Sequence, residues 1–197
     1  MGVRTAGRAT PSPLPEKIGN LLKESRWLAL GAVALFLSMA LWGFRKDDPG
    51  WSHAVVTGKL HNPTGHAGAW VADLLLYLFG FSAWWWIVLL AVVIWWGFRR
   101  LHSPLGNLDR RPLYIALAGF ALLLVASSAL EALRFHTLKV ELPLAPGGVL
   151  GLEGSRWLAS NLGFIGATLF LLATLALAWS VFSGMSWLWA FEKLGLI

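Results

Sequence analysis

Four long apolar stretches, separated by polar segments, constrain this chain more than any other feature. They cover residues 27–44, 74–98, 113–130 and 162–182, and none contains Lys, Arg, Asp or Glu. A helix needs about 20 apolar residues to cross a hydrocarbon core about 30 Å thick. Each stretch is long enough to cross, the shorter ones with help from flanking residues. The sequence therefore predicts an all-α integral membrane protein with four transmembrane helices and additional short interfacial helices.

The composition agrees with a membrane location. The mean hydropathy is +0.64 and 57% of the residues are hydrophobic, which is too apolar for a soluble domain. The absence of cysteine excludes a disulfide framework and thiolate catalysis. Many of the thirteen tryptophans lie near the ends of the apolar stretches, where indole rings prefer the membrane–water interface. Membrane anchoring is the simplest interpretation of these tryptophans.

The charges predict an orientation. When the polar segments are assigned alternately to two sides, ten basic and four acidic residues fall on the side of the N-terminal tail. Six basic and six acidic residues fall on the other side, so the first side carries the whole net charge of +6. The positive-inside rule then places both termini and residues 99–111 in the cytoplasm. Because the basic residues are dispersed, nucleic-acid binding by this chain is a weak alternative.

The remaining segments predict the organisation of the chain. Residues 1–16 are rich in Gly, Ser, Thr and Pro and are expected to form a disordered cytoplasmic tail. Residues 17–183 are expected to form the membrane domain, with an interfacial or tilted portion before a break at residues 80–82. A second break is expected at residues 183–184. Residues 184–197 are then predicted to form a juxtamembrane cytoplasmic helix.

The sequence offers little support for catalysis. No phosphate-binding Gly-x-x-x-x-Gly-Lys-[Ser/Thr] motif is present, because Gly58-Lys59 lacks the upstream glycine. His53, His61 and His66 share one predicted loop, but their spacing matches no reliable metal-ligand pattern, and we expect them to be solvated. We therefore predict no catalytic residue, no metal and no cofactor.

The predicted spans carry no ionisable residue at mid-membrane depth, which disfavours an ion or proton pathway. Asp73 and Glu131 are the nearest candidates. Asp73 is expected near the start of the second helix, where a carboxylate interacts favourably with the positive helix end. Glu131 lies one turn from Arg134, and an interfacial ion pair between the two is expected.

Several short motifs occur in a characteristic order. They are Asp-Asp-Pro-Gly-Trp-Ser at 47–52, His-Asn-Pro-Thr-Gly at 61–65, Gly-Ala-Trp-Val-Ala-Asp at 68–73, Leu-Phe-Gly at 78–80, Gly-Gly-Val-Leu-Gly at 147–151, Ser-Gly-Met-Ser-Trp at 183–187 and Glu-Lys-Leu-Gly at 192–195. Together they resemble the N-terminal four-helix membrane domain of the FtsK/SpoIIIE DNA translocase family. The resemblance covers residues 22–197, and the Gly-Ala-Trp-x-Ala-Asp motif is its most specific part.

The resemblance implies a role in bacterial cell division and chromosome partition. Such a domain has four spans with both ends cytoplasmic, lies in the inner membrane at the division septum, and helps to assemble the divisome. It also tethers a hexameric, ATP-driven motor that pumps double-stranded DNA. This chain stops at Ile197, where a linker and motor would follow, so we expect an isolated membrane domain or a natural truncation. DNA and ATP are expected to act only through the absent motor.

The sequence thus predicts a non-enzymatic membrane anchor and divisome-interaction module. The expected partners are the lipid bilayer, other divisome membrane proteins and further copies of this chain. A homo-oligomeric pore or channel component remains an alternative. The candidate residues either contact a partner or only shape the outer loops, and both interpretations stay open. These residues are Asp48, Pro49, Trp51, Asn62, Gly65, Gly68, Trp70, Asp73, Gly147, Gly148 and Gly151.

Overall fold

The computed structural model describes residues 16–54, 60–101, 111–135, 141–187, 192 and 195. Within these residues all regular structure is helical, which confirms the all-α prediction. The elements are α1 (Glu16–Trp42), α2 (Gly65–Phe79), the 3₁₀ helix η1 (Gly80–Trp84), α3 (Trp85–Leu101), α4 (Arg111–Arg134) and α5 (Gly148–Ser183). Residues 1–15 of the predicted N-terminal tail and most of the predicted juxtamembrane helix lie outside the described residues, and Glu16, the last residue of the predicted tail, is the first residue of α1.

Four helical stretches are long and apolar enough to cross a membrane, which confirms the central prediction. They are Ser25–Trp42, Gly65–Trp96, Leu113–Arg134 and Gly148–Ser183. The second and fourth stretches are 32 and 36 residues long, and a crossing needs only about 20. Each of these two stretches contains a bend, so that only part of it runs in the direction of the other spans.

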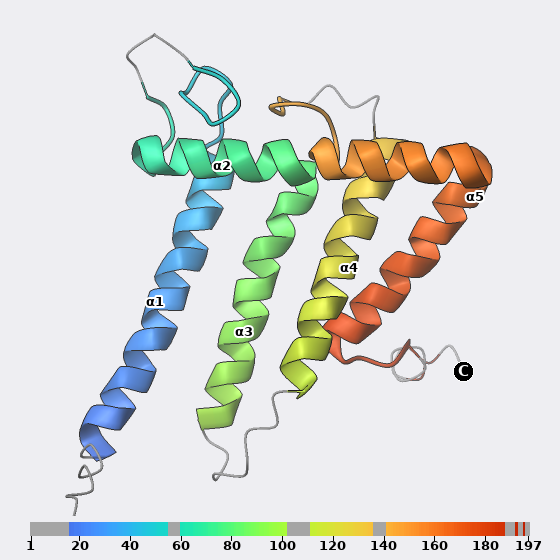
Figure 1. Cartoon of the computed structure of the whole chain (residues 1–197). Helices are drawn as coiled ribbons and strands as arrows, with labels where there is room; N and C mark the ends of the chain where they lie inside the picture. The colour runs from blue at the N-terminus through green and yellow to red at the C-terminus, as the bar shows by residue number, and fades with distance from the viewer. Residues whose placement is uncertain are drawn as a thin grey trace, which may run out of the picture.

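Two helical segments lie across the ends of the spans and form what we call the platform (Figure 1). The platform consists of α2 and of residues 148–162 of α5. After α2 the chain turns through η1 into α3, and this turn confirms the break expected at residues 80–82. After residue 162 the chain turns at Gly163, and the rest of α5 descends beside α4 (Figure 1).

The bend in α5 depends on a glycine conformation. Gly163 has φ 67° and ψ 172° inside an otherwise continuous helix. This region of backbone space is essentially restricted to glycine. The helix then runs to Ser183, and Gly184 follows in the left-handed conformation with its N–H donating to the carbonyl of Ser180. The end of the helix therefore lies at the second break that the sequence predicted.

One buried apolar cluster of the bundle lies between α3, α4 and the descending part of α5. Phe120 and Leu123 of α4 and Phe182 of α5 are buried, and tryptophans of α3 pack against them. The ring of Trp86 meets that of Phe120 edge to face, with centroids 5.3 Å apart. This packing makes α3 and α4 neighbours. The aromatic cluster therefore joins the spans below the platform.

Candidate functional site

The carboxylate of Asp48 organises the loop between α1 and α2. Asp48 is buried, with 2% of its surface exposed, and accepts hydrogen bonds from the backbone N–H of His61 at 2.7 Å and of Asn62 at 2.8 Å. The Nδ1 atom of His61 lies 3.2 Å from the same carboxylate. A buried carboxylate is tolerated when its lone pairs are satisfied in this way. Asp48 therefore ties the start of the loop to its end.

Asn62 connects this loop to the helices on either side of it. Its side-chain Nδ2 donates to the carbonyl of Ala40 in α1 at 3.0 Å. Its Oδ1 accepts from the backbone N–H and the hydroxyl of Thr64, immediately before α2. Gly68 is buried against this turn, and a Cβ atom there would collide with the Thr64 hydroxyl. The motif residues Asn62 and Gly68 therefore shape the entry into α2.

Asp73 fastens the loop to the middle of α2. The backbone N–H and the hydroxyl of Ser52 donate to its two oxygens, at 2.6 and 3.0 Å, and Nδ1 of His53 lies 3.8 Å away. Because α2 begins at Gly65, Asp73 lies more than two turns inside the helix. The expected interaction with the positive helix end is therefore wrong. The carboxylate instead binds a loop residue 21 positions earlier.

The two candidate tryptophans of this region are exposed. Trp51 and Trp70 keep 48% and 46% of their surface accessible, and Pro49 is half-buried. The Trp51 ring meets Tyr77 of α2 edge to face, with centroids 5.2 Å apart. Gly65 starts α2 with φ +75°. The structure thus separates buried polar residues that hold the loop from exposed tryptophans that remain available for contact.

We expected the three histidines to be solvated, and His61 and His66 are indeed exposed, while His53 is half-buried. Two of them also make polar contacts within the loop. His61 contacts Asp48, and the Nε2 atom of His53 lies 2.7 Å from the carbonyl of Lys46. His66 is exposed on α2. Among the residues that the structure describes, no three His, Cys, Asp or Glu side chains form a group that could hold a metal ion.

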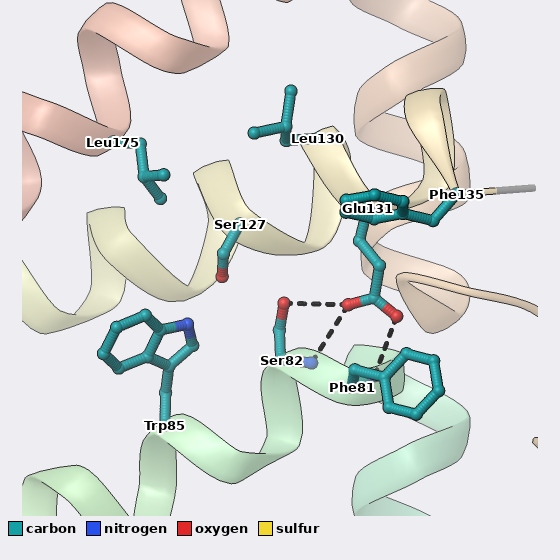
Figure 2. Close-up of a pocket in the computed structure, with 8 residues that line it drawn as sticks. All are labelled: Phe81, Ser82, Trp85, Ser127, Leu130, Glu131, Phe135 and Leu175. Atoms are coloured by element: carbon teal, nitrogen blue, oxygen red, sulfur yellow. Dashed lines mark hydrogen bonds between the residues drawn. The ribbon is translucent and has the colours of Figure 1, made fainter.

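Glu131 of α4 forms a second polar centre, between the two segments of the platform (Figure 2). One carboxylate oxygen accepts from the backbone N–H groups of Phe81 at 2.8 Å and Gly147 at 2.7 Å. The other accepts from the N–H and the hydroxyl of Ser82, both at 3.0 Å. Glu131 is buried. Through these hydrogen bonds its side chain joins α4 to η1 and to Gly147, the residue before α5.

The expected ion pair between Glu131 and Arg134 is wrong. Both oxygens of Glu131 point to η1 and Gly147, and Arg134 turns to α5 instead. Its Nε donates to the hydroxyl of Thr168 at 3.1 Å, and its guanidinium carbon lies 4.5 Å from the centroid of the Phe164 ring. Spacing along one helix suggested a local pair, but both side chains have partners on other elements.

The three predicted glycines before and within α5 permit close packing. Gly147 and Gly151 both face the carbonyl of Ser128 in α4, and a Cβ atom on either would overlap that carbonyl. Gly148 is similarly close to the backbone of Leu78 in α2. Together these glycines bring the start of α5 against α4 and against the end of α2. All three are buried where the start of α5 meets α4 and the end of α2.

An open pocket of about 380 Å³ lies beside Glu131 (Figure 2). Its lining consists of Phe81, Ser82, Trp85, Ser127, Leu130, Glu131, Phe135 and Leu175. Glu131 is the only titratable group among these lining residues, and its oxygens are occupied by N–H and hydroxyl donors. This lining offers no acid–base pair or activated nucleophile. The polar side chains Glu131 and Ser82 of this wall bind each other and so join α4 to η1.

Some residues of these polar centres were not foreseen. Ser52, Thr64 and Ser82 supply hydroxyl or backbone donors to Asp73, Asn62 and Glu131. Serine and threonine are common in loops and turns, and nothing in their local sequence indicates a carboxylate 21 or 49 residues away.

Comparison with known proteins shows the family. A family model described as the 4TM region of DNA translocase FtsK/SpoIIIE matches residues 19–195. The chain is 45% identical to DNA translocase FtsK 2 of Ralstonia nicotianae over 192 residues, which cover 95% of this chain and 25% of that protein. It is 33% identical to DNA translocase FtsK of Shewanella oneidensis, over 89% of this chain and 19% of that protein. No solved structure matches.

The chain therefore spans a quarter or less of the length of these relatives. The part that matches is the membrane region, and the four candidate spans agree with that match. The chain belongs to the FtsK/SpoIIIE family of DNA translocases, as its 4TM region, and is a bacterial membrane protein.

Proposed function

We propose that this chain is the membrane anchor and partner-contact module of a septal DNA translocase, acting in cell division and chromosome segregation. Its family membership and its four candidate spans support the anchoring role. Relatives that carry the name DNA translocase are four to five times longer than the matched region, so DNA and ATP would be handled outside it. In this proposal both termini lie in the cytoplasm and the platform faces the opposite side of the inner membrane.

The contact role is supported by two exposed tryptophans that are carried by segments fixed to one another. Trp51 and Trp70 are about half exposed, while the loop and helix that carry them are tied together through Asp73. Tryptophan is enriched in the energetically dominant parts of protein–protein interfaces. A rigid support also reduces the entropy lost on binding. We propose that Trp51 and Trp70 touch other divisome membrane proteins, and that the buried motif residues only hold them in place.

Self-association is part of the same proposal. Gly31 in α1 leaves open space, because an added Cβ atom there would meet no atom outside its own helix within 4 Å. Small residues on a lipid-facing surface allow close approach of a second helix. Mass measurement of the purified protein in detergent, compared with a Gly31→Leu variant, tests this point. The proposal requires a larger assembly for the unmodified chain than for the variant.

The contact role is tested by the position of the protein in dividing bacteria. The 197-residue chain is fused to a fluorescent protein and produced in cells that keep their own translocase. The unmodified fusion is expected at midcell, and Trp51→Ala with Trp70→Ala is expected to spread it over the whole membrane. Trp157→Ala is the matched control, because Trp157 is 68% exposed and lies in the other segment of the platform. Midcell fluorescence of the double variant, or equal loss in the control, would overturn the proposed contact surface.

A further inference from the structure

Arg134, the last residue of α4, is a cation without a carboxylate partner among the residues that the structure describes. Glu131, one turn earlier, directs its oxygens to η1 and Gly147. Glu153 pairs with Arg156 at 2.8 Å. Ionised side chains at the edge of a membrane either pair with an opposite charge or reach the head-group layer. The charge of Arg134 is therefore available to an anion from outside the described chain.

The guanidinium group of Arg134 is nevertheless held in one orientation. Its Nε–H donates to the hydroxyl of Thr168, and its guanidinium carbon lies over the ring of Phe164. Phe164 and Thr168 both lie in the part of α5 that comes after the bend at Gly163. The two terminal amino groups make no hydrogen bond to the described residues. A guanidinium whose remaining donors form a fixed fork is suited to bind phosphate oxygens in pairs.

The position of Arg134 indicates which anion it meets. It ends the candidate span Leu113–Arg134, at the corner where α4 reaches the platform (Figure 1). The next residue, Phe135, is half exposed, and so is Phe164. Arginine and aromatic side chains at the end of a span lie at the level of the lipid head groups. The abundant anion at that level is the phosphodiester of a phospholipid.

We propose that Arg134 binds the phosphate of a phospholipid head group, in a site at the corner between α4 and α5. Thr168 and Phe164 orient the guanidinium, and the exposed aromatic rings beside it contact the first part of the acyl chains. Recognition depends on the phosphate, so a lipid with the same chains and no phosphate is bound less well. Free phosphate shares this chemistry but lacks the apolar contacts.

Native mass spectrometry of the purified 197-residue chain in detergent tests the site. The probes are phosphatidylglycerol and diacylglycerol with identical oleoyl chains. For the unmodified protein we expect clear retention of phosphatidylglycerol over diacylglycerol. Arg134→Gln is expected to retain phosphatidylglycerol about tenfold less, the effect of losing one charged hydrogen-bonding group. Arg156→Gln is the matched control, because it removes an equal charge from an exposed residue of the platform.

Thr168→Val separates orientation from charge, because it keeps Arg134 and removes only the hydroxyl that accepts from its Nε. A partial loss of phosphatidylglycerol is expected, and circular dichroism checks that each variant is folded. If Arg134→Gln does not fold, Arg134→Lys and Thr168→Val decide the question. Equal retention by all folded variants, or equal loss in Arg156→Gln, would overturn the site. Equal protection of the protein against heat by inorganic phosphate and by phosphatidylglycerol would assign the site to a free anion and overturn the lipid assignment.

Discussion

At the scale of single residues, three buried carboxylates determine the structure of the platform end. Asp48, Asp73 and Glu131 each accept hydrogen bonds from backbone N–H groups of distant segments. A buried N–H that loses its acceptor costs about 1–3 kcal/mol, more than an average hydrogen bond contributes. Removal of any of these carboxylates should therefore destabilise the fold before it affects a contact with another protein.

Asp48→Asn should lower the free energy of unfolding by about 1–3 kcal/mol, because the amide NH2 replaces one of the two oxygens and faces the N–H group of either His61 or Asn62 with a second donor. Thermal unfolding in detergent, followed by circular dichroism, measures the change. Asp47→Asn is the matched control: it makes the same substitution on the neighbouring exposed residue and should change stability by less than about 0.5 kcal/mol. Equal melting temperatures for the two variants would contradict the structural role of Asp48.

Glu131→Gln should lower the free energy of unfolding at least as much as Asp48→Asn does, because four donors converge on the two oxygens of Glu131. An amide in this place leaves one or two of them unsatisfied, at about 1–3 kcal/mol each. Glu153→Gln provides the comparison, since exposed ion pairs contribute about 0–1 kcal/mol. The same unfolding measurement applies. A variant of Glu131 as stable as that of Glu153 would show that the junction does not depend on the carboxylate.

The sequence identified several of these residues but not their tasks. Asp48, Asn62 and Asp73 stand out within short motifs, and each proves to be buried. Their partners could not be predicted, because a carboxylate binds whichever N–H groups the fold brings near it. Glu131 shows the difficulty clearly: spacing along one helix favoured Arg134, whereas the structure supplies partners from two other segments.

At the scale of the elements, the bend at Gly163 should respond to a small substitution. Gly163→Ala meets no atom within 4 Å, but it forces a side chain into φ 67°. Such strain costs about 1–3 kcal/mol. Asn161→Ala is the control, because Asn161 is exposed and lies in the same helix just before the bend, where alanine is favoured over asparagine by up to about 0.7 kcal/mol. Opposite shifts in melting temperature are expected, and shifts of the same sign would contradict the bend.

The sequence predicted where the helices break better than it predicted where one of them begins. Gly80 and Gly184 follow long apolar runs, and both mark observed helix ends. The platform helix over residues 148–162 was not predicted, because glycines at 148, 151 and 154 lower the local helix propensity. The structure uses these glycines for contact with α4 and α2, so packing between elements overrides the local preference.

At the scale of the whole molecule, the number of spans followed from composition, whereas the platform did not. Hydropathy is a local property, because each span must match the bilayer by itself. The crosswise placement of α2 and of residues 148–162 depends on the junction at Glu131, which combines three distant segments. The fold class was therefore predictable, and the geometry of the candidate contact surface was not.

The predicted orientation can be measured because the chain contains no cysteine, so that any introduced thiol is unique. The loop between α1 and α2 lies at the platform end, and the chain leaves α5 at the opposite end (Figure 1). Asp47→Cys is in that loop and Ser186→Cys follows α5, both at exposed positions. A membrane-impermeant maleimide should label the first in intact spheroplasts and the second only after lysis, as the positive-inside rule requires. The reverse pattern would contradict the orientation with both termini in the cytoplasm.

The most direct measurement of the central claim is the rescue of division in bacteria depleted of their own septal translocase. The cells produce this 197-residue chain fused to a fluorescent protein. Fluorescence at midcell together with restored septation is the predicted result, because the membrane region would then anchor and contact its partners without the rest of the translocase. Uniform membrane fluorescence with continued filamentation would contradict the claim that this region is the partner-contact module.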